Sequence, residues 1–221
     1  MNNYQLLLDA TKAKDAALIA VSKTKPIEDI KVVYLQGQRI FAENKVQEMC
    51  EKYEHLPKDI QWHLIGHLQT NKVKYIIPFV HTIQSVDSLK LLQEIQKEAK
   101  KIFRRINILL QFHIATEETK FGLSLPEAQD ILEGLQANPE LYDCINICGV
   151  MGMASFTDDA AQVRKEFASL KNMFIILKNT YFPFTSSFKE ISMGMSGDYQ
   201  IALEEGSTMI RVGSLLFGSR V

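Results

Sequence analysis

The sequence predicts an α/β protein whose strands close into a single (β/α)8 TIM barrel. Short apolar runs alternate with amphipathic stretches along the 221 residues, and eight of these runs have the length and composition of strands. Eight strand–helix units suit a barrel on the small side of the usual roughly 250 residues. A doubly wound open sheet is the alternative, although eight strands would be many for it. The predicted strands are 18–24, 39–44, 61–67, 81–87, 106–115, 145–155, 190–196 and 208–218.

The helices are predicted from apolar residues that recur along one face. Residues 1–17, before the first strand, are expected to form one helix on the outside or at the bottom of the barrel. In 88–103 the spacing puts Leu92 and Ile95 on a common face. The segment 158–179 begins with an acidic turn, which suits the positive end of a helix dipole.

Charge and composition exclude several classes of partner. Lysine and arginine total 25 against 26 aspartates and glutamates, for a formal net charge of -1. This balance gives no electrostatic reason to expect nucleic acid or an anionic membrane surface as the main partner. The one basic cluster, 97–105, is interpreted as a solvated helix end. With 46% hydrophobic residues and no linker-like segment, the chain is expected to form one domain over 1–221.

The cysteines and the longest apolar runs indicate a cytoplasmic protein. Cys50, Cys144 and Cys148 are odd in number and have no zinc-site spacing, so reduced thiols are the simplest interpretation. Nothing resembles a signal peptide. No apolar run approaches the roughly 20 residues of a membrane-spanning helix.

The first strand ends in a lysine that could serve as a nucleophile. Strand alternation puts Val21, Lys23 and Lys25 on one side. If Val21 points into the barrel, the Lys23 ammonium is partly desolvated at the barrel mouth, its pKa falls, and the neutral amine can form a Schiff base with a carbonyl compound. The alternative is a lysine that extends to solvent or pairs with a carboxylate. Lys25 lies nearer the rim, where a surface or phosphate-attracting charge is expected.

Two late loops have the residues of an anion site. Ser196 and Gly197 follow the seventh predicted strand, and Asp198 opens a helix. Gly213 and Ser214 lie near the end of the eighth. Small residues with free N–H groups at adjacent strands seven and eight are typical of the phosphate site of such barrels. The alternative for the first loop is an ordinary helix cap.

Arg211 is a candidate ligand-facing residue, whereas the histidines are less informative. Arg211 shares a strand face with Gly213, and a buried arginine needs an acceptor, which can be a carboxylate or a ring nitrogen of a cofactor. His63 and His67 are four residues apart on a predicted strand and lack the helical spacing of a metal pair. No set of histidine, cysteine and carboxylate residues predicts a metal site.

Seven stretches, taken together, resemble one known family. They are AVSKTKP (20–26), FAENKVQE (41–48), WHLIGHLQTNK (62–72), IQSVDS (83–88), ETKFGL (118–123), SMGMSGD (192–198) and GSTMIRVGSLLFGSR (206–220). In order and spacing they resemble the YggS/PROSC family of pyridoxal phosphate homeostasis proteins. The resemblance runs from about Leu18 to the C-terminus, and it implies a barrel like the N-terminal domain of alanine racemase.

The resemblance also implies a cofactor and a binding site. It implies pyridoxal 5′-phosphate (PLP) held as a Schiff base on Lys23, with Arg211 facing the pyridine nitrogen. An arginine there would not keep that nitrogen protonated, so the cofactor would be a weak electron sink. Asn44 is expected beside the ring or its hydroxyl. The implied phosphate contacts are Ser196, Gly213 and Ser214, with backbone contacts at Met195 and Gly197.

The function expected from the resemblance is PLP homeostasis: the protein binds PLP, buffers or delivers it, and has no strong catalytic activity. A low-activity PLP-dependent amino-acid racemase is the first alternative, and it would need a second base opposite Lys23. A Schiff-base aldolase barrel without PLP is the second. The expected partners are PLP and apo forms of PLP-dependent enzymes, and the expected state is a monomer. Departures from the family pattern, at Ala42, Lys45, His67 and 196–198, fall on the rim.

Overall fold

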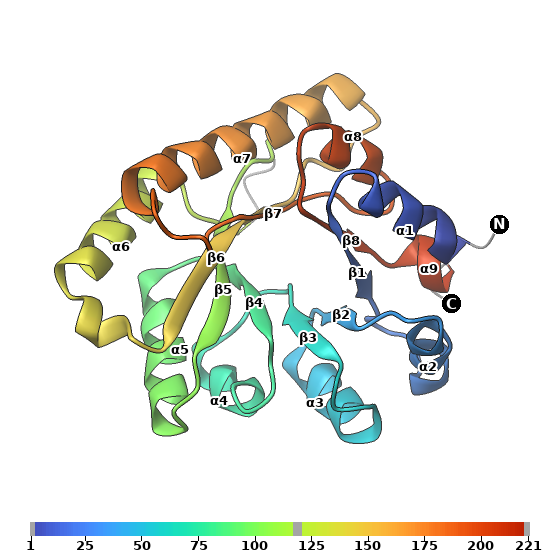
Figure 1. Ribbon diagram of the computed structural model, residues 1–221, viewed down its shortest axis with the longest axis horizontal. Helices are drawn as coiled ribbons and strands as arrows, with labels where there is room; N and C mark the ends of the chain where they lie inside the picture. The colour runs from blue at the N-terminus through green and yellow to red at the C-terminus, as the bar shows by residue number, and fades with distance from the viewer. Residues whose placement is uncertain (1–2, 117–120, 219–221) are drawn as a thin grey trace.

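The strands form a closed parallel barrel in the order β1 to β8, as predicted. The computed structural model describes residues 3–116 and 121–218. Figure 1 shows the eight strands around a common centre, with helices outside them. The strands are β1 (Ala17–Val21), β2 (Ile40–Glu43), β3 (Gln61–Leu64), β4 (Thr82–Val86), β5 (Ile106–Phe112), β6 (Ile145–Gly152), β7 (Glu190–Ser192) and β8 (Met209–Val212).

The helices cover the outside of the barrel, and α1 lies beside β1 and α9 (Figure 1). Tyr4 of α1 bonds Gln38, whose amide donates to the Leu18 carbonyl, so α1 is fixed on the outside. The helices are α1 (Asn3–Lys12), α2 (Ile27–Leu35), α3 (Val46–His55), α4 (Val73–Ile76), α5 (Leu89–Lys101), α6 (Leu125–Ala137), α7 (Ala160–Tyr181), α8 (Tyr199–Glu204) and α9 (Ser214–Phe217), with short 3-10 turns at η1 (Thr70–Lys72) and η2 (Pro139–Tyr142).

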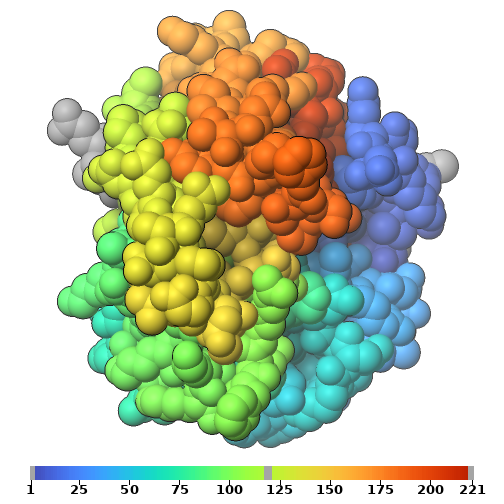
Figure 2. All heavy atoms as spheres, turned by 60° about the vertical axis from the view of Figure 1, so that its left-hand side comes forward, coloured from blue at the N-terminus to red at the C-terminus, as the bar shows by residue number. Residues whose placement is uncertain are grey.

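Local sequence signals set several helix ends. The Ser88 side chain accepts the Leu91 N–H at the start of α5. Ser124 and Glu127 form a reciprocal capping box at the start of α6. The Tyr181 hydroxyl of α7 donates to the Glu133 carboxylate of α6, and the Gln136 side-chain amide of α6 donates to the Tyr181 carbonyl. The two helices lie side by side on the surface in Figure 2. Among the described residues, no helix has both the length and the apolar character needed to cross a membrane.

Strand alternation divides the buried residues into two regions. Side chains such as Phe41 and Trp62 point outward and form the main core under the helices. A smaller group around Ile19, Val21 and Ala42 fills the interior of the barrel. The interior is apolar next to β1 and β2, and it becomes polar toward β4, β7 and β8.

Several strands are shorter than predicted because small or apolar residues continue into the loops beyond them. β1 ends at Val21, so Lys23 lies in a turn and not on the strand. β7 ends at Ser192, and Gly194 then takes a φ of +96°. The prediction of 208–218 as one strand was wrong, because β8 ends at Val212 and α9 follows. Parts of two family-like stretches, 118–120 and 219–220, lie outside the described residues.

Candidate functional site

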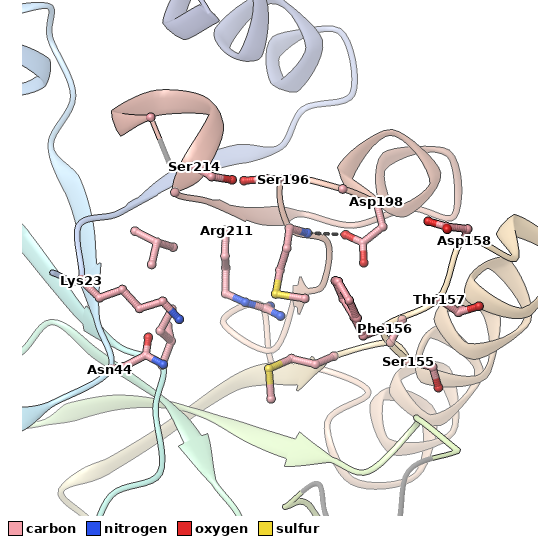
Figure 3. A pocket seen from close by; sticks show the side chains of 18 of the residues that line it. Lys23, Asn44, Ser155, Phe156, Thr157, Asp158, Ser196, Asp198, Arg211 and Ser214 are labelled. Atoms are coloured by element: carbon pink, nitrogen blue, oxygen red, sulfur yellow. Dashed lines mark hydrogen bonds between the residues drawn. The ribbon is translucent and has the colours of Figure 1, made fainter. Parts of the chain in front are cut away.

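A cavity of about 600 Å³ opens at the carboxyl end of the strands. Its walls come from the loops after β1, β2, β3, β6, β7 and β8. Figure 3 shows Lys23 and Asn44 on one side of the pocket, Ser196 and Ser214 close together on another, and Arg211 between the two groups. All eight predicted site residues line this cavity: Lys23, Asn44, Met195, Ser196, Gly197, Arg211, Gly213 and Ser214.

Lys23 lies in a tight turn that follows β1. The Lys25 N–H donates to the Ser22 carbonyl at 3.0 Å and closes the turn, so Lys23 and Thr24 are its central residues. Lys25 also lines the cavity, and its ammonium donates to the Phe217 carbonyl of α9 at 2.9 Å. The turn therefore directs the Lys23 side chain into the cavity. The bond from Lys25 connects the rim of the cavity to α9.

Arg211 lies at the floor of the cavity and is 3% exposed. Its guanidinium donates to the Ser192 hydroxyl at 2.7 Å and to the Gly152 carbonyl at 2.8 Å. Both acceptors are neutral, and burial lowers the pKa of Arg211 to about 10. From the sequence, a carboxylate was one of the two acceptors considered for Arg211. The two bonds go to a hydroxyl and a backbone carbonyl instead. The guanidinium remains a positive charge facing the cavity.

A chain of hydrogen bonds inside the barrel continues from Arg211. The Ser192 hydroxyl donates to Oε1 of the Gln84 side chain at 2.7 Å, and Nε2 of the same side chain donates to His63 Nδ1 at 2.8 Å. Burial lowers the pKa of His63 to about 3, so its ring is neutral and accepts this bond. Gln84 and Ser192 were not predicted as site residues, although both lie in stretches of the family resemblance, 83–88 and 192–198.

Asn44 follows β2 and brings an unused acceptor to the cavity. Its Oδ1 is buried and has no hydrogen-bond partner among the described residues. The backbone of Asn44 packs tightly on Gly66, where an added Cβ would lie 2.3 Å from the Asn44 carbonyl oxygen. Glycine at position 66 thus permits the close approach that places Asn44.

The two serine-bearing loops form the upper wall of the cavity. The Ser196 and Ser214 side chains face each other in Figure 3. The backbone N–H groups of Ser196 and Gly197 have no acceptor within the part of the chain that the structure describes. The Met195 N–H, in contrast, donates to the Asp198 carboxylate. An anion in this loop would thus meet the N–H groups of Ser196 and Gly197, while that of Met195 is already bonded.

The loop after β6 forms a further wall that the sequence analysis did not assign. Met153, Phe156 and Asp158 line the cavity there. Ser155 is buried, and its N–H and hydroxyl donate to the Glu166 carboxylate of α7 at 2.6 and 2.7 Å. The sequence offered no clear signal for this wall, because the pairing of Ser155 with a carboxylate eleven positions later has no local pattern.

A buried ionic cluster lies just outside the barrel, behind the Lys23 turn. The Lys52 ammonium of α3 is 2.7 Å from Glu43 of β2 and 2.6 Å from Glu48 of α3. Burial raises the pKa of Glu43 to about 7, and its Oε2 has no hydrogen-bond partner among the described residues. The available sequence signal was the position of Lys52 on the face of α3 that buries Val46 and Met49.

Comparison with known proteins places this geometry in a family. The family model described as the alanine racemase N-terminal domain matches residues 1–221. The chain is 38% identical to the pyridoxal phosphate homeostasis protein of Aquifex aeolicus, with 93% of this chain and 87% of that protein aligned. It is 34% identical to the protein of the same name from Pasteurella multocida, with 99% and 93% aligned.

Solved structures give the same result. PipY of Synechococcus elongatus, solved with PLP bound, is 31% identical, with a TM-score of 0.84 over 98% of this chain and 100% of that one. An alanine racemase of Clostridium difficile has a TM-score of 0.71 at 17% identity, over 99% of this chain and 56% of that one. The second likeness shows the fold alone.

Proposed function

Because this chain belongs to the family of pyridoxal phosphate homeostasis proteins, we propose that it binds PLP as a Schiff base on Lys23. By this binding it buffers the free cofactor or delivers it to other proteins, with no strong catalytic activity. The observation that supports the proposal is a single cavity that unites an amine, a buried guanidinium and two serine-bearing loops.

The residues of the cavity fit the chemical groups of PLP. The Lys23 amine is the nucleophile for the aldehyde. The unpartnered Oδ1 of Asn44 suits the ring hydroxyl, which can donate to it. The Arg211 guanidinium can donate to the pyridine nitrogen, and the Ser196 and Ser214 hydroxyls can donate to the phosphate oxygens. Each polar group of the ligand thus has a complementary partner.

The charge on Arg211 favours limited carbanion chemistry at this site. PLP, when bound, supplies an electron sink whose strength depends on a proton at the ring nitrogen. Arg211 donates hydrogen bonds and carries a positive charge, so it would oppose protonation of that nitrogen. Weak carbanion stabilisation follows, which suits storage of the cofactor.

The remaining parts of the proposal concern context. We propose a monomer that acts in the cytoplasm as one PLP-binding domain over 1–221, with apo PLP-dependent enzymes as recipients. Its three cysteines are free thiols in the described residues, which is compatible with a reducing compartment.

Titration with PLP tests the proposal. The wild-type protein should gain a visible absorption band on adding PLP, and Lys23→Ala should not. Lys25→Ala is the matched control, because Lys25 lines the same cavity and should leave the band in place. A band retained in Lys23→Ala and lost in Lys25→Ala would reassign the Schiff base.

Turnover of amino acids separates the carrier from a racemase. With saturating PLP, we expect rates far below the roughly 10 per second of a typical enzyme. Racemisation near that rate, abolished in Lys23→Ala, would favour the enzyme instead.

A further inference from the structure

Lys52 is a buried lysine whose three N–H groups all have acceptors. One acceptor is the carbonyl of Ser22, the residue before Lys23, and another is Glu48, which also bonds Thr24, the residue after Lys23. The Lys52 side chain is 6% exposed. Its ammonium donates to the Ser22 carbonyl at 2.7 Å, to Glu43 at 2.7 Å and to Glu48 at 2.6 Å. An ammonium has three donors, so no capacity is left over.

The same cluster holds both residues adjacent to Lys23. On one side, the Ser22 carbonyl accepts from Lys52, and the Ser22 hydroxyl donates to Glu43 at 2.6 Å. On the other side, the Thr24 N–H donates to the Glu48 carboxylate at 2.6 Å. Lys52 links the two sides, because it bonds Ser22 directly and Glu48 through an ion pair.

The turn needs such support because Thr24 has a strained backbone. Its φ is +63°, in the left-handed region that β-branched residues rarely adopt. Glycine or asparagine is preferred at this position of a turn with positive φ. A strained conformation persists only when the surrounding structure over-determines it. The bond from Thr24 to Glu48 provides that restraint.

We propose that Lys52, with Glu48, is a positioning residue that fixes the turn so that the Lys23 amine points at the carbonyl carbon of the ligand. This inference rests on the proposed function. Neither residue is among those lining the cavity, so both act on Lys23 through the backbone of its neighbours. A buried ion pair adds little stability compared with apolar packing, so stability alone does not explain a charge at position 52. The role that remains for this charge is to orient the turn that carries Lys23.

The test compares two ligands on four proteins and, at the end, on one double variant. PLP has the aldehyde, and 4′-deoxypyridoxine 5′-phosphate has a methyl group in its place, so only PLP depends on the Lys23 amine. The proteins are wild type, Lys52→Met, Glu48→Gln and Glu51→Gln, the last an exposed control on α3. Dissociation constants come from fluorescence titration, and the Schiff base is followed by absorbance.

Lys52→Met should bind PLP roughly tenfold to a hundredfold more weakly, since a reacting group misplaced by about 1 Å can lose up to about a hundredfold of its proximity advantage in forming the covalent bond. Its affinity for the deoxy ligand should stay within a factor of about two, because the ring and phosphate contacts remain. Glu48→Gln should show a smaller loss of the same kind, and Glu51→Gln none. Adding Thr24→Gly to Lys52→Met should recover part of the PLP affinity, because glycine relieves the strain.

Equal losses for both ligands, or no loss for PLP, would overturn the positioning role. If Lys52→Met does not fold, Glu48→Gln decides, since Glu48 is partly exposed and its substitution leaves Lys52 with two of its acceptors. Failure of the proposed function has a different signature: wild type would then show no Schiff-base absorbance with PLP.

Discussion

The guanidinium of Arg211 donates a hydrogen bond of 2.7 Å to the hydroxyl of Ser192, at the floor of the cavity. That hydroxyl donates in turn to Gln84, so each proton in the chain points away from Arg211. The arrangement holds the guanidinium in place through neutral groups and leaves its charge for a ligand. With the bond from Arg211 to the Gly152 carbonyl of β6, the central electrostatic feature of the site is built from four strands, β4, β6, β7 and β8.

Replacing Arg211 by glutamate should change how the bound cofactor responds to pH. A carboxylate facing the ring nitrogen would hold a proton there, whereas the arginine opposes it. We expect the absorption spectrum of Arg211→Glu with PLP to differ from wild type in its pH dependence. Spectra recorded from pH 6 to pH 9, on protein shown by circular dichroism to be folded, measure this. Superimposable profiles would contradict the assigned role.

The serines at positions 196 and 214 should matter only for ligands with a phosphate. A hydrogen bond to a charged group contributes about 1.5–3 kcal/mol, so each alanine variant should weaken PLP binding about tenfold or more. Pyridoxal, which lacks the phosphate, should bind both variants as it binds wild type. Parallel titrations with the two ligands measure the difference. A matching loss for pyridoxal would place these hydroxyls elsewhere in the site.

Gly66→Ala should disturb Asn44 and lower stability. The added Cβ would lie 2.3 Å from the Asn44 carbonyl oxygen, so the backbone must shift. Overpacking of this kind typically costs about 1–3 kcal/mol of unfolding free energy. Gly134→Ala is the control, because nothing lies within 4 Å of its Cβ, and alanine in helix α6 should stabilise by about 0.5–1 kcal/mol. Urea unfolding distinguishes the two, and equal stabilities would contradict the close approach.

Glu43 should make stability depend on pH. Its pKa in the folded protein, about 7, lies above its ordinary value of 4.5, so the folded state binds the proton more tightly than the unfolded chain. The resulting stabilisation is complete below about pH 4.5 and is lost as the pH rises through 7. We expect the difference in unfolding free energy between wild type and Glu43→Gln to change between pH 5 and pH 8. A constant difference over this range would contradict the raised pKa.

The barrel, and several residues that line the candidate cavity, could be predicted because their signals are local or periodic. Asn44 and Met195 were implied only by the family resemblance. Apolar runs marked the strands, and the lysine and serines just beyond them marked the mouth. Alternation put Lys23 on the same side as Val21, and both line the cavity, but the turn after β1 and not the strand places Lys23 there. Strand ends were overestimated because the cavity walls are themselves apolar, as at Met153 and Met195.

The support behind the site was not predictable in the same way. Lys52 meets Ser22 across 30 positions of sequence, and no spacing rule links them. The positive φ of Thr24 could not be predicted from the sequence, because threonine is not a residue that indicates a left-handed turn position. The bond from Met195 to Asp198 likewise depends on loop geometry that the residue types alone leave open.

Borohydride reduction of the protein with PLP, followed by peptide mass mapping, identifies the lysine that forms the Schiff base. We expect one pyridoxyl-phosphate adduct per chain, on Lys23, with the visible band lost on reduction. A protein that takes up no PLP, or an adduct confined to another lysine, would contradict it.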